Sequence, residues 1–196
     1  MRRSARTTSR GLKTRDKVLD TAREVVLRAG PMGLSMRAVA KRANMSLGNL
    51  QFHYRDPTSI LRGILERELA LGVEGAERAA ARSAQSDPIG AAIDAMLDRQ
   101  KAPGSGKLFF SLWAFAASSP SLGEVLRDFY ADWIERLARG LRAHDTGVTA
   151  AEAKQRAFLF VATLEGASLF RCGVAGRWTR TQETSLRRAL RGLLTD

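Results

Sequence analysis

SMRAVAKRANMSLGNLQFHY, residues 35–54, predicts two short helices joined by a tight turn. Ser35 and Ser46 are suitable N-cap residues, because a serine hydroxyl oxygen accepts from an otherwise unpaired amide of the first helical turn. Asn44 stands at the break between them, and asparagine tolerates the left-handed backbone conformation better than other non-glycine residues do. The pattern is that of a helix-turn-helix, whose second helix is suited to the major groove of duplex DNA.

The second helix of this pair has an apolar side and a polar side. Leu47, Leu50 and Tyr54 recur at helical spacing and predict the apolar side. The side chains between them are predicted to point outward. Among these, the amides of Asn49 and Gln51 can each pair with an adenine through two atoms, which is how such side chains read a base in the major groove.

Other residues of this helix have separate predicted roles. Gly48 allows the backbone to approach DNA closely, and Ser46 and Leu47 lie near the helix N-terminus, which favours phosphate. Arg55 follows the helix and is also placed for a phosphate. Phe52 either contacts a thymine methyl group or packs inward, and both interpretations remain open.

Residues 35–61 resemble the DNA-binding domain of the TetR family of transcriptional regulators. The resemblance rests on Ser-Met-Arg-Ala-Val-Ala at 35–40, Ser-Leu-Gly-Asn-Leu-Gln-Phe-His-Tyr-Arg-Asp at 46–56 and the apolar pair Ile60-Leu61. A helix over 15–29 also fits. The resemblance implies phosphate contacts by Ser35 and Arg37 on one side of the groove and by His53 on the other. Without DNA contact, Ser35 is only a helix cap and Arg37 an exposed arginine.

Two positions depart from the family pattern. Pro57 stands where the family commonly has a phosphate-contacting lysine, and Gln51 stands where it has an aromatic residue. Arg55 or the N-terminal arm can replace the lysine contact, or that contact is absent. The amide of Gln51 implies a different reading of bases.

Positive charge is concentrated at one end of the chain. The 196 residues carry a formal net charge of +12. Residues 1–62 hold 14 lysines and arginines against 4 acidic residues, whereas residues 63–196 hold 18 against 16. Duplex DNA needs such a patch, because basic side chains that neutralise phosphates release counterions. The other interpretation is a merely solvated basic surface.

Further helices are predicted along the rest of the chain, together with an arm at its start. Residues 1–11 are expected to be a disordered basic arm, which either contacts DNA or only aids solubility. Helical spacing of apolar residues and the breaks at glycine and proline predict the other boundaries. The predicted helices cover residues 13–29, 36–43, 47–54, 57–83, 89–100, 107–117, 122–144, 150–171 and 181–194. The far half of the fourth, residues 74–82, is alanine-rich and charged and is expected to face solvent.

The predicted fold is all-α, with about nine helices. A three-helix helix-turn-helix domain over 12–56 is followed by a linking helix over 57–85. The remaining residues, 86–196, form a larger helical domain that the resemblance assigns to ligand binding and dimerisation. Two-fold symmetry doubles the contact of a helix-turn-helix with DNA, so a homodimer is expected. The candidate dimer residues are Phe158, Val161, Ala162, Glu165, Leu169, Leu186, Leu190 and Leu193, some of which can instead fill the core of one protomer.

An effector site is the third candidate. Aromatic residues gather on three predicted helices of the larger domain, and ligand sites are mostly apolar. The candidate residues are Met96, Phe109, Phe110, Trp113, Phe129 and Trp133. Each can equally belong to an ordinary core, and the resemblance names no effector. An apolar or aromatic molecule is expected.

Other function classes find little support in the sequence. The chain has two histidines, His53 and His144, and one cysteine, Cys172, which is expected to be a buried small hydrophobe. No cluster of metal-ligating residues and no phosphate-binding glycine loop is present. We therefore expect no metal, no cofactor and no catalysis. No apolar run reaches the length of about 18 residues that spans a membrane, and a soluble cytoplasmic protein is expected.

Two hypotheses for the function follow. The first is a sequence-specific DNA-binding regulator, acting as a repressor that a small molecule releases from operator DNA. The second is a non-specific basic nucleic-acid-binding protein whose helical domain only forms oligomers. They differ in whether Asn49 and Gln51 confer sequence preference.

Overall fold

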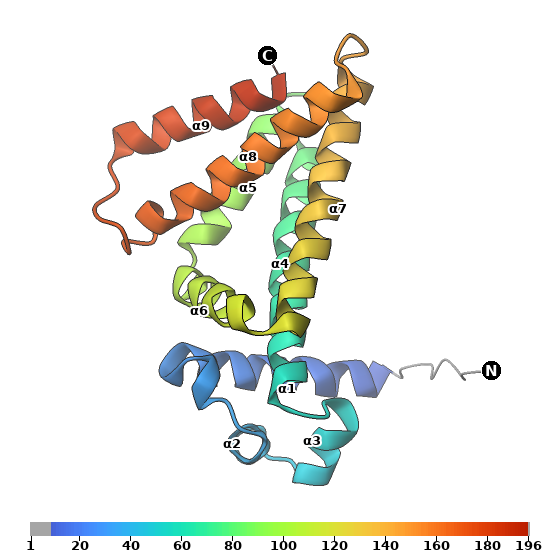
Figure 1. Ribbon diagram of the computed structural model, residues 1–196, viewed down its shortest axis with the longest axis vertical. Helices are drawn as coiled ribbons and strands as arrows, with labels where there is room; N and C mark the ends of the chain where they lie inside the picture. The colour runs from blue at the N-terminus through green and yellow to red at the C-terminus, as the bar shows by residue number, and fades with distance from the viewer. Residues whose placement is uncertain (1–8, 196) are drawn as a thin grey trace, which may run out of the picture. The chain divides into compact units, whose positions relative to one another are not determined.

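The computed structural model describes residues 9–195 and is all-α, as predicted (Figure 1). Within those residues it has nine α-helices, one 3-10 helix and no strand. The elements are α1 (Ser9–Ala29), η1 (Pro31–Gly33), α2 (Met36–Arg42), α3 (Leu47–His53), α4 (Pro57–Arg82), α5 (Pro88–Lys101), α6 (Ser105–Ser118), α7 (Pro120–His144), α8 (Ala150–Arg171) and α9 (Arg180–Thr195). Each predicted helix is found, with bounds that differ by a few residues.

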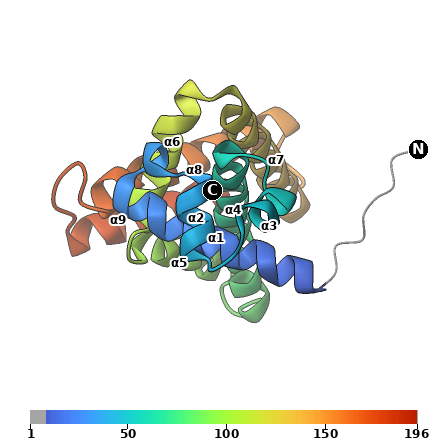
Figure 2. The ribbon, with the colours of Figure 1, turned by 90° about the horizontal axis from the view of Figure 1, so that it is seen from below.

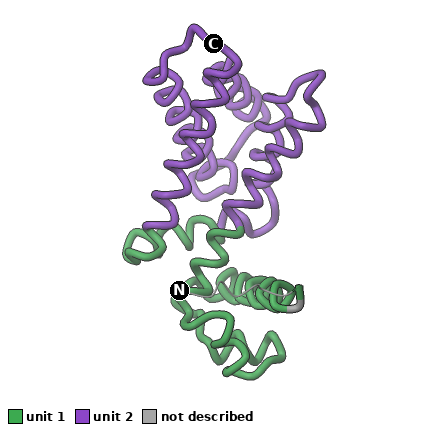
Figure 3. Tube along the Cα trace, turned by 90° about the vertical axis from the view of Figure 1, so that its right-hand side faces the viewer, with its two compact units in different colours: residues 1–67, 108–123 green, residues 68–107, 124–196 purple. Residues whose placement is uncertain are grey.

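The chain divides into two compact units (Figure 3). Unit 1 comprises residues 1–67 and 108–123, and unit 2 comprises residues 68–107 and 124–196. The boundaries fall inside α4, α6 and α7, which therefore contribute residues to both units. The domain limits predicted at residues 56 and 85 stay a prediction.

Helices α1, α2 and α3 meet in unit 1, where Figure 2 shows them from below. Their apolar stripes are buried as the helical spacing predicts. The fully or almost fully buried side chains of these helices and their connections are Val18, Leu19, Ala22, Val25, Val26, Leu34, Val39, Ala40, Ala43, Leu50 and Tyr54. This small core fixes the helix-turn-helix through side chains from all three helices.

The start of α1 differs from its prediction. The helix begins at Ser9, four residues before the predicted start at Lys13. Residues 9–12 contain no proline, so the helix can extend towards the N-terminus over them. The predicted disordered arm covers residues 1–11; its residues 1–8 lie outside the described residues, and the expectation is wrong for residues 9–11, which belong to α1.

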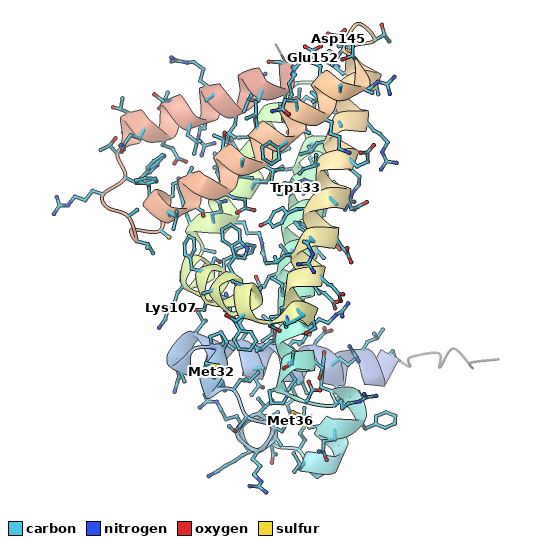
Figure 4. The ribbon with its side chains drawn as sticks, viewed as in Figure 1. Met32, Met36, Lys107, Trp133, Asp145 and Glu152 are labelled. Carbon is cyan, nitrogen blue, oxygen red and sulfur yellow. The ribbon has the colours of Figure 1, made fainter. Side chains whose placement is uncertain are left out.

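Unit 2 is built around α8, which packs against both α5 and α9, and the latter two also contact each other. Its main core joins α5, α7, α8 and α9 through Ile93, Leu97, Trp133, Phe160, Val161, Leu164, Leu186 and Leu190; Figure 4 labels Trp133 on α7. A second cluster near the α7–α8 connection contains Ala138, Leu141, Val148, Ala153 and Ala157. Thr149 caps α8 by accepting from the amide of Glu152 at 3.2 Å.

Two expectations about exposure need correction. The expectation that residues 74–82 face solvent holds for the charged side chains of this segment, which are exposed, but Ala76 and Ala79 of α4 are buried. A small side chain allows close packing of the helix on that side, while the charged residues occupy the other. Cys172 is exposed and not a buried hydrophobe, because it follows the last residue of α8 and leads into the connection to α9.

A buried ion network closes the end of unit 2 where α8 turns towards α9. The carboxylate of Glu183 accepts from Arg171 Nε at 3.0 Å, Lys101 Nζ at 2.9 Å and Trp178 Nε1 at 2.7 Å. Arg187 adds a further bond at 3.0 Å. Burial alone would raise the pKa of Glu183, but these hydrogen bonds outweigh it and lower the pKa to about 2. Glu183 is therefore ionised and joins α5, α8 and α9.

No helix in the described part of the chain combines the length and the apolar character that crossing a membrane requires.

Candidate nucleic-acid interface

The turn between α2 and α3 has the geometry that the sequence predicts. Asn44 has φ of 50° and is the one non-glycine residue between 9 and 195 with a positive φ. Its amide bonds the carbonyl of Lys41 at 3.2 Å, and the amide of Met45 bonds the carbonyl of Ala40 at 3.0 Å. This pair of bonds is a Schellman motif, which ends α2 and redirects the chain into α3.

Both predicted caps are formed. Ser35 Oγ accepts from the amide of Ala38 at 3.2 Å, and Ser46 Oγ accepts from the amide of Asn49 at 3.1 Å. In each case the hydroxyl proton stays available for another acceptor, because a serine hydroxyl both donates and accepts. A cap at the start of α3 therefore does not prevent Ser46 from donating to a phosphate.

We expect Ser46→Ala to lower the free energy of unfolding by about 1 kcal/mol, because the amide of Asn49 loses its acceptor. Urea denaturation followed by circular dichroism measures this change. Ser118→Ala is the matched control, since the side chain of Ser118 is exposed and makes no hydrogen bond within residues 9–195; its effect should stay below about 0.5 kcal/mol. Equal effects of the two substitutions would show that the cap contributes nothing.

Helix α3 is anchored at its C-terminal end. Leu50 and Tyr54 are buried, and the guanidinium of Arg15 lies 4.6 Å from the centroid of the Tyr54 ring. Arg15 also donates to the backbone carbonyl of His53 at 3.2 Å. Burial raises the pKa of the Tyr54 hydroxyl, and the positive charges of Arg15 and Arg67 oppose that rise. Arg15 of α1 therefore holds the C-terminal end of α3 through the Tyr54 ring and the His53 carbonyl.

The opposite side of α3 is exposed. Gly48, Asn49, Gln51 and Arg55 are all exposed, and Phe52 is the most exposed of the large apolar residues, at 85%. Phe52 therefore does not pack inward, and its ring contacts the His53 ring edge to face at 5.2 Å. An exposed aromatic side chain can contact an apolar group of DNA, such as a thymine methyl group. Contact of these residues with DNA stays a prediction.

Helix α2 adds cations to this surface. Arg37 is exposed, and Lys41, one turn later on the same face, is exposed too. The side chains of Arg37 and Lys41 form no ion pair or hydrogen bond within residues 9–195, whereas the side chain of Arg42 bonds Glu24 at 3.2 Å. Lys41 was missed at the sequence level, although its spacing of four from Arg37 was a usable signal. Ser35, Arg37 and Lys41 form the α2 part of the candidate interface.

The eight candidate dimer residues differ in burial. Val161, Leu186 and Leu190 are buried within one protomer and belong to the main core of unit 2, which supports the interpretation that they fill the core. Leu193 packs against that core and is half-buried. Phe158, Ala162 and Leu169 are exposed on α8. Leu159 and Phe170, which the sequence did not single out, are exposed beside them.

The eighth dimer candidate, Glu165, lies elsewhere. Its carboxylate accepts from the hydroxyl of Tyr130 at 3.1 Å, so it faces α7. Burial raises the pKa of Glu165 to about 7, against the lowering effect of the Tyr130 hydrogen bond. The donor of this hydrogen bond, the Tyr130 hydroxyl, carries no charge. Buried acidic side chains in proteins usually pair with a positive charge, so the surroundings of Glu165 are unusual.

The six candidate effector residues are divided between the units. Phe109, Phe110 and Trp113 belong to unit 1, where both phenylalanine rings contact the Trp113 ring edge to face, at 5.3 and 5.9 Å. Met96, Phe129 and Trp133 belong to unit 2, where the Phe129 and Trp133 ring centroids are 5.6 Å apart. Met96 and Phe129 are half-buried there. Binding of a ligand to these residues stays a prediction.

No group of three or more histidine, cysteine, aspartate or glutamate side chains in the described part of the chain is arranged to hold a metal ion.

Comparison with known proteins identifies relatives of both parts of the chain. The family model for the C-terminal domain of BetI-type transcriptional repressors matches residues 87–195. An uncharacterized helix-turn-helix-type transcriptional regulator of Xanthobacter autotrophicus, from the 5′ region of dhlA, is 27% identical over 137 residues. That match covers 64% of this chain and 64% of the relative, so the chain spans about two thirds of that protein.

Solved structures of similar fold cover nearly the whole chain. A protein from Rhodococcus sp. assigned to the TetR family of transcriptional regulators is 19% identical, with a TM-score of 0.73 over 94% of this chain and 100% of that one. The multidrug binding protein EbrR, solved in complex with imidazole, is 21% identical, with a TM-score of 0.63 over 93% of this chain and 95% of EbrR. At these identities the structures show a shared fold.

Proposed function

We propose that this chain is a dimeric repressor, which binds operator DNA through α3 and is released by a small molecule. The proposal starts from the family: the chain belongs to the TetR family of transcriptional regulators. In this proposal it acts in the cytoplasm, where that DNA lies. The observation that carries it is the surface of α3, where Asn49 and Gln51 are exposed while Leu50 and Tyr54 are buried. This arrangement holds the helix rigidly and leaves its base-reading amides free.

Recognition in this proposal separates into two kinds of contact. Asn49 and Gln51 read base edges, and Phe52 contacts a thymine methyl group, which together give sequence preference. Ser35, Arg37, Lys41 and Arg55 contact phosphates and fix the position of α3 in the groove. The excess of ten positive charges in residues 1–62 supports this role, since phosphate contacts supply most of the salt-dependent affinity.

The second copy of the chain is proposed to cover the exposed apolar side of α8. Phe158, Leu159, Leu169 and Phe170 are between 37% and 51% exposed and repeat at helical spacing on one helix. Contiguous exposed apolar side chains on a monomer mark an interaction surface. A two-fold dimer would place the same surface against itself, and would present two copies of α3 to one operator.

Phe158→Glu should weaken this dimer. A charge placed in an apolar interface must lose its hydration without gaining a partner, so the dimer dissociation constant should rise at least about tenfold. Sedimentation velocity over a range of protein concentrations measures it. Arg139→Gln on the exposed side of α7 is the control, because it changes the net charge by the same one unit. An unchanged dissociation constant for Phe158→Glu would place the interface elsewhere.

Regulation is proposed to follow from two states of the protein. A small molecule bound among the aromatic residues of the larger domain favours a state in which the two copies of α3 no longer match successive major grooves. Helix α4 is one of the three helices, with α6 and α7, that have residues in both units, and it follows directly on the helix-turn-helix. The description of EbrR as a multidrug binding protein supports a small molecule as the effector.

Fluorescence anisotropy with labelled DNA from upstream of the protein's own gene tests the function. The expected result is a complex at least about 10³-fold tighter than with unrelated duplexes at the same salt concentration, with an affinity that falls as salt rises. Equal affinity for all duplexes would instead support the non-specific nucleic-acid-binding hypothesis.

A further inference from the structure

Helix α3 is short and has few anchors of its own. Leu50 is the one buried side chain among its seven residues, Leu47–His53. At the N-terminal end the cap by Ser46 and the turn from α2 fix the chain. Helix α3 packs mainly against α2, which in turn packs against α1. A two-turn helix with one buried side chain can roll about its own axis unless its C-terminal end is fixed as well.

Arg15 of α1 supplies this second point of attachment. Its Nη1 donates to the carbonyl of His53 at 3.2 Å, and its guanidinium lies 4.6 Å from the centroid of the Tyr54 ring. Tyr54 directly follows α3 and is 4% exposed. The last carbonyls of a helix lack partners within it and carry a partial negative charge, so an arginine is favourable there. The ring face attracts the same cation.

The partners of Arg15 differ from those of two other arginines in unit 1. Arg42 pairs with Glu24 at 3.2 Å, and Arg67 pairs with Asp20 at 2.9 Å. Arg15 has no carboxylate partner within residues 9–195; its partners there are the ring and the carbonyl at the end of α3. Because a guanidinium is planar, stacking and hydrogen bonding together restrict both the distance and the direction of the contact. The contact therefore fixes the end of α3 in position and in rotation.

The rotation of α3 decides where its two base-reading amides lie. Asn49 and Gln51 directly precede and follow Leu50, and successive residues of an α-helix are about 100° apart around its axis. A roll of α3 therefore moves one amide towards the bases and the other away from them. Side chains extend about 5–6 Å from the helix axis, so a roll of about 10° moves each amide by about 1 Å. Hydrogen-bond distances vary over only about 0.5 Å, so such a roll breaks the paired contacts with a base.

We propose that Arg15 is a positioning residue for base recognition, which fixes the rotation of α3 through the Tyr54 ring and the His53 carbonyl and does not itself bind DNA. This inference rests on the proposed function, in which Asn49 and Gln51 read the operator. The exposed cations of α2 contact phosphates in that function, whereas Arg15 acts on α3.

Fluorescence anisotropy with operator and unrelated duplexes, over a range of salt concentrations, tests the proposal. We expect Arg15→Gln to lower the preference for operator over unrelated DNA at least about tenfold, because misplaced amides lose their paired contacts. Its affinity for unrelated DNA and its salt dependence should equal those of Lys17→Gln, the matched control. Lys17 lies on the same helix, and its exposed side chain forms no hydrogen bond or ion pair within residues 9–195. Its replacement removes the same charge and should leave the preference unchanged.

Arg15→Lys is the second variant, since it keeps the charge and loses only the planar guanidinium. Its preference for the operator should fall at least about threefold, with the affinity for unrelated DNA and the salt dependence of the unaltered protein. That unchanged affinity also shows that the variant is folded. A lysine variant with the full preference would show that charge alone acts at this position, and would overturn the proposal.

A double-mutant cycle with Tyr54→Leu assigns the effect to the contact. Leucine keeps an apolar side chain at the buried position and removes the ring. Because Tyr54→Leu and Arg15→Gln remove parts of one contact, their joint loss of operator preference should be smaller than the product of the two separate losses. A joint loss equal to that product would mean that the two residues act independently, which contradicts the proposal.

The outcomes also separate this proposal from the proposed function. If the unaltered protein shows no preference for the operator, both fail. If it shows the preference and Arg15→Gln retains it, the proposed function stands and the positioning role is wrong. If Arg15→Gln weakens binding to all duplexes alike and lowers the salt dependence by about one counterion per protomer, Arg15 contacts a phosphate. That result would overturn the positioning role and leave the proposed function in place.

Discussion

Replacing both Asn49 and Gln51 by alanine is expected to reduce the affinity for operator DNA to that for unrelated DNA. Each amide that pairs with a base through two atoms contributes about 1–3 kcal/mol of discrimination. A dimer makes each contact twice, so four contacts are lost. Their sum is comparable with the whole preference of specific over non-specific binding, which is typically about 4–10 kcal/mol.

The phosphate contacts should survive this double replacement. Arg37, Lys41 and Arg55 are untouched, so the residual affinity should keep the salt dependence of the original complex. Fluorescence anisotropy with operator and scrambled duplexes at several salt concentrations measures both quantities. Gln85→Ala, which removes an exposed amide between α4 and α5, is the control and should change neither. A double variant that keeps its preference for the operator would remove α3 from sequence recognition.

Replacing Glu183 by glutamine is expected to lower the free energy of unfolding by about 3–5 kcal/mol, the usual effect of breaking a buried ion pair from one side. Arg171 is the reason: its side chain is 1% exposed, and its carboxylate partner is Glu183, at 3.0 Å. Glutamine has nearly the same shape but no charge, and its amide group faces donors from Arg171, Lys101 and Trp178. The guanidinium would stay buried without an anion.

The same substitution should remove part of the acid sensitivity of the protein. The pKa of Glu183 is lowered from 4.5 to about 2 on folding, so the unfolded chain takes up the proton first as pH falls. Stability from this group is fully present above about pH 4.5 and is lost as pH falls towards 2, by about 3 kcal/mol in total. Glu183→Gln should show a correspondingly shallower loss across that range.

Urea denaturation at pH 7 and at pH 3 measures both effects. Glu135→Gln is the control, because the pair of Glu135 with Lys154, at 3.6 Å, is exposed on both sides and should contribute less than about 1 kcal/mol. If Glu183→Gln is no more destabilising than Glu135→Gln, the network does not hold α5, α8 and α9 together.

Local chemistry explains why the helix-turn-helix could be predicted in detail. Ser35, Asn44 and Ser46 act on amides within four residues of themselves, so their roles depend on sequence spacing alone. The exposed and buried sides of α3 follow from the same spacing, since alternate faces of one helix are fixed by its period. The candidate interface was therefore visible in the sequence, apart from Lys41.

Contacts between distant segments could not be predicted in this way. Val161, Leu186 and Leu190 have the same spacing as an interface stripe, and only the packing of α8 between α5 and α9 shows that they fill the core of one protomer. Glu165 lies on α8 and Glu183 on α9, and residue type alone does not tell them apart. The carboxylate of Glu165 meets a tyrosine, whereas that of Glu183 meets two arginines, a lysine and a tryptophan, and these partners lie 4 to 82 positions away in the sequence.

In vitro selection from a random duplex library tests most directly the central claim that the exposed side of α3 reads DNA sequence. We predict that the protein enriches a two-fold symmetric motif whose half-sites are separated by about one helical turn or a multiple of it. Each half-site should contain adenines that the double variant of Asn49 and Gln51 no longer selects. Sequences that show no enriched motif, or an identical motif selected by the double variant, would contradict the claim.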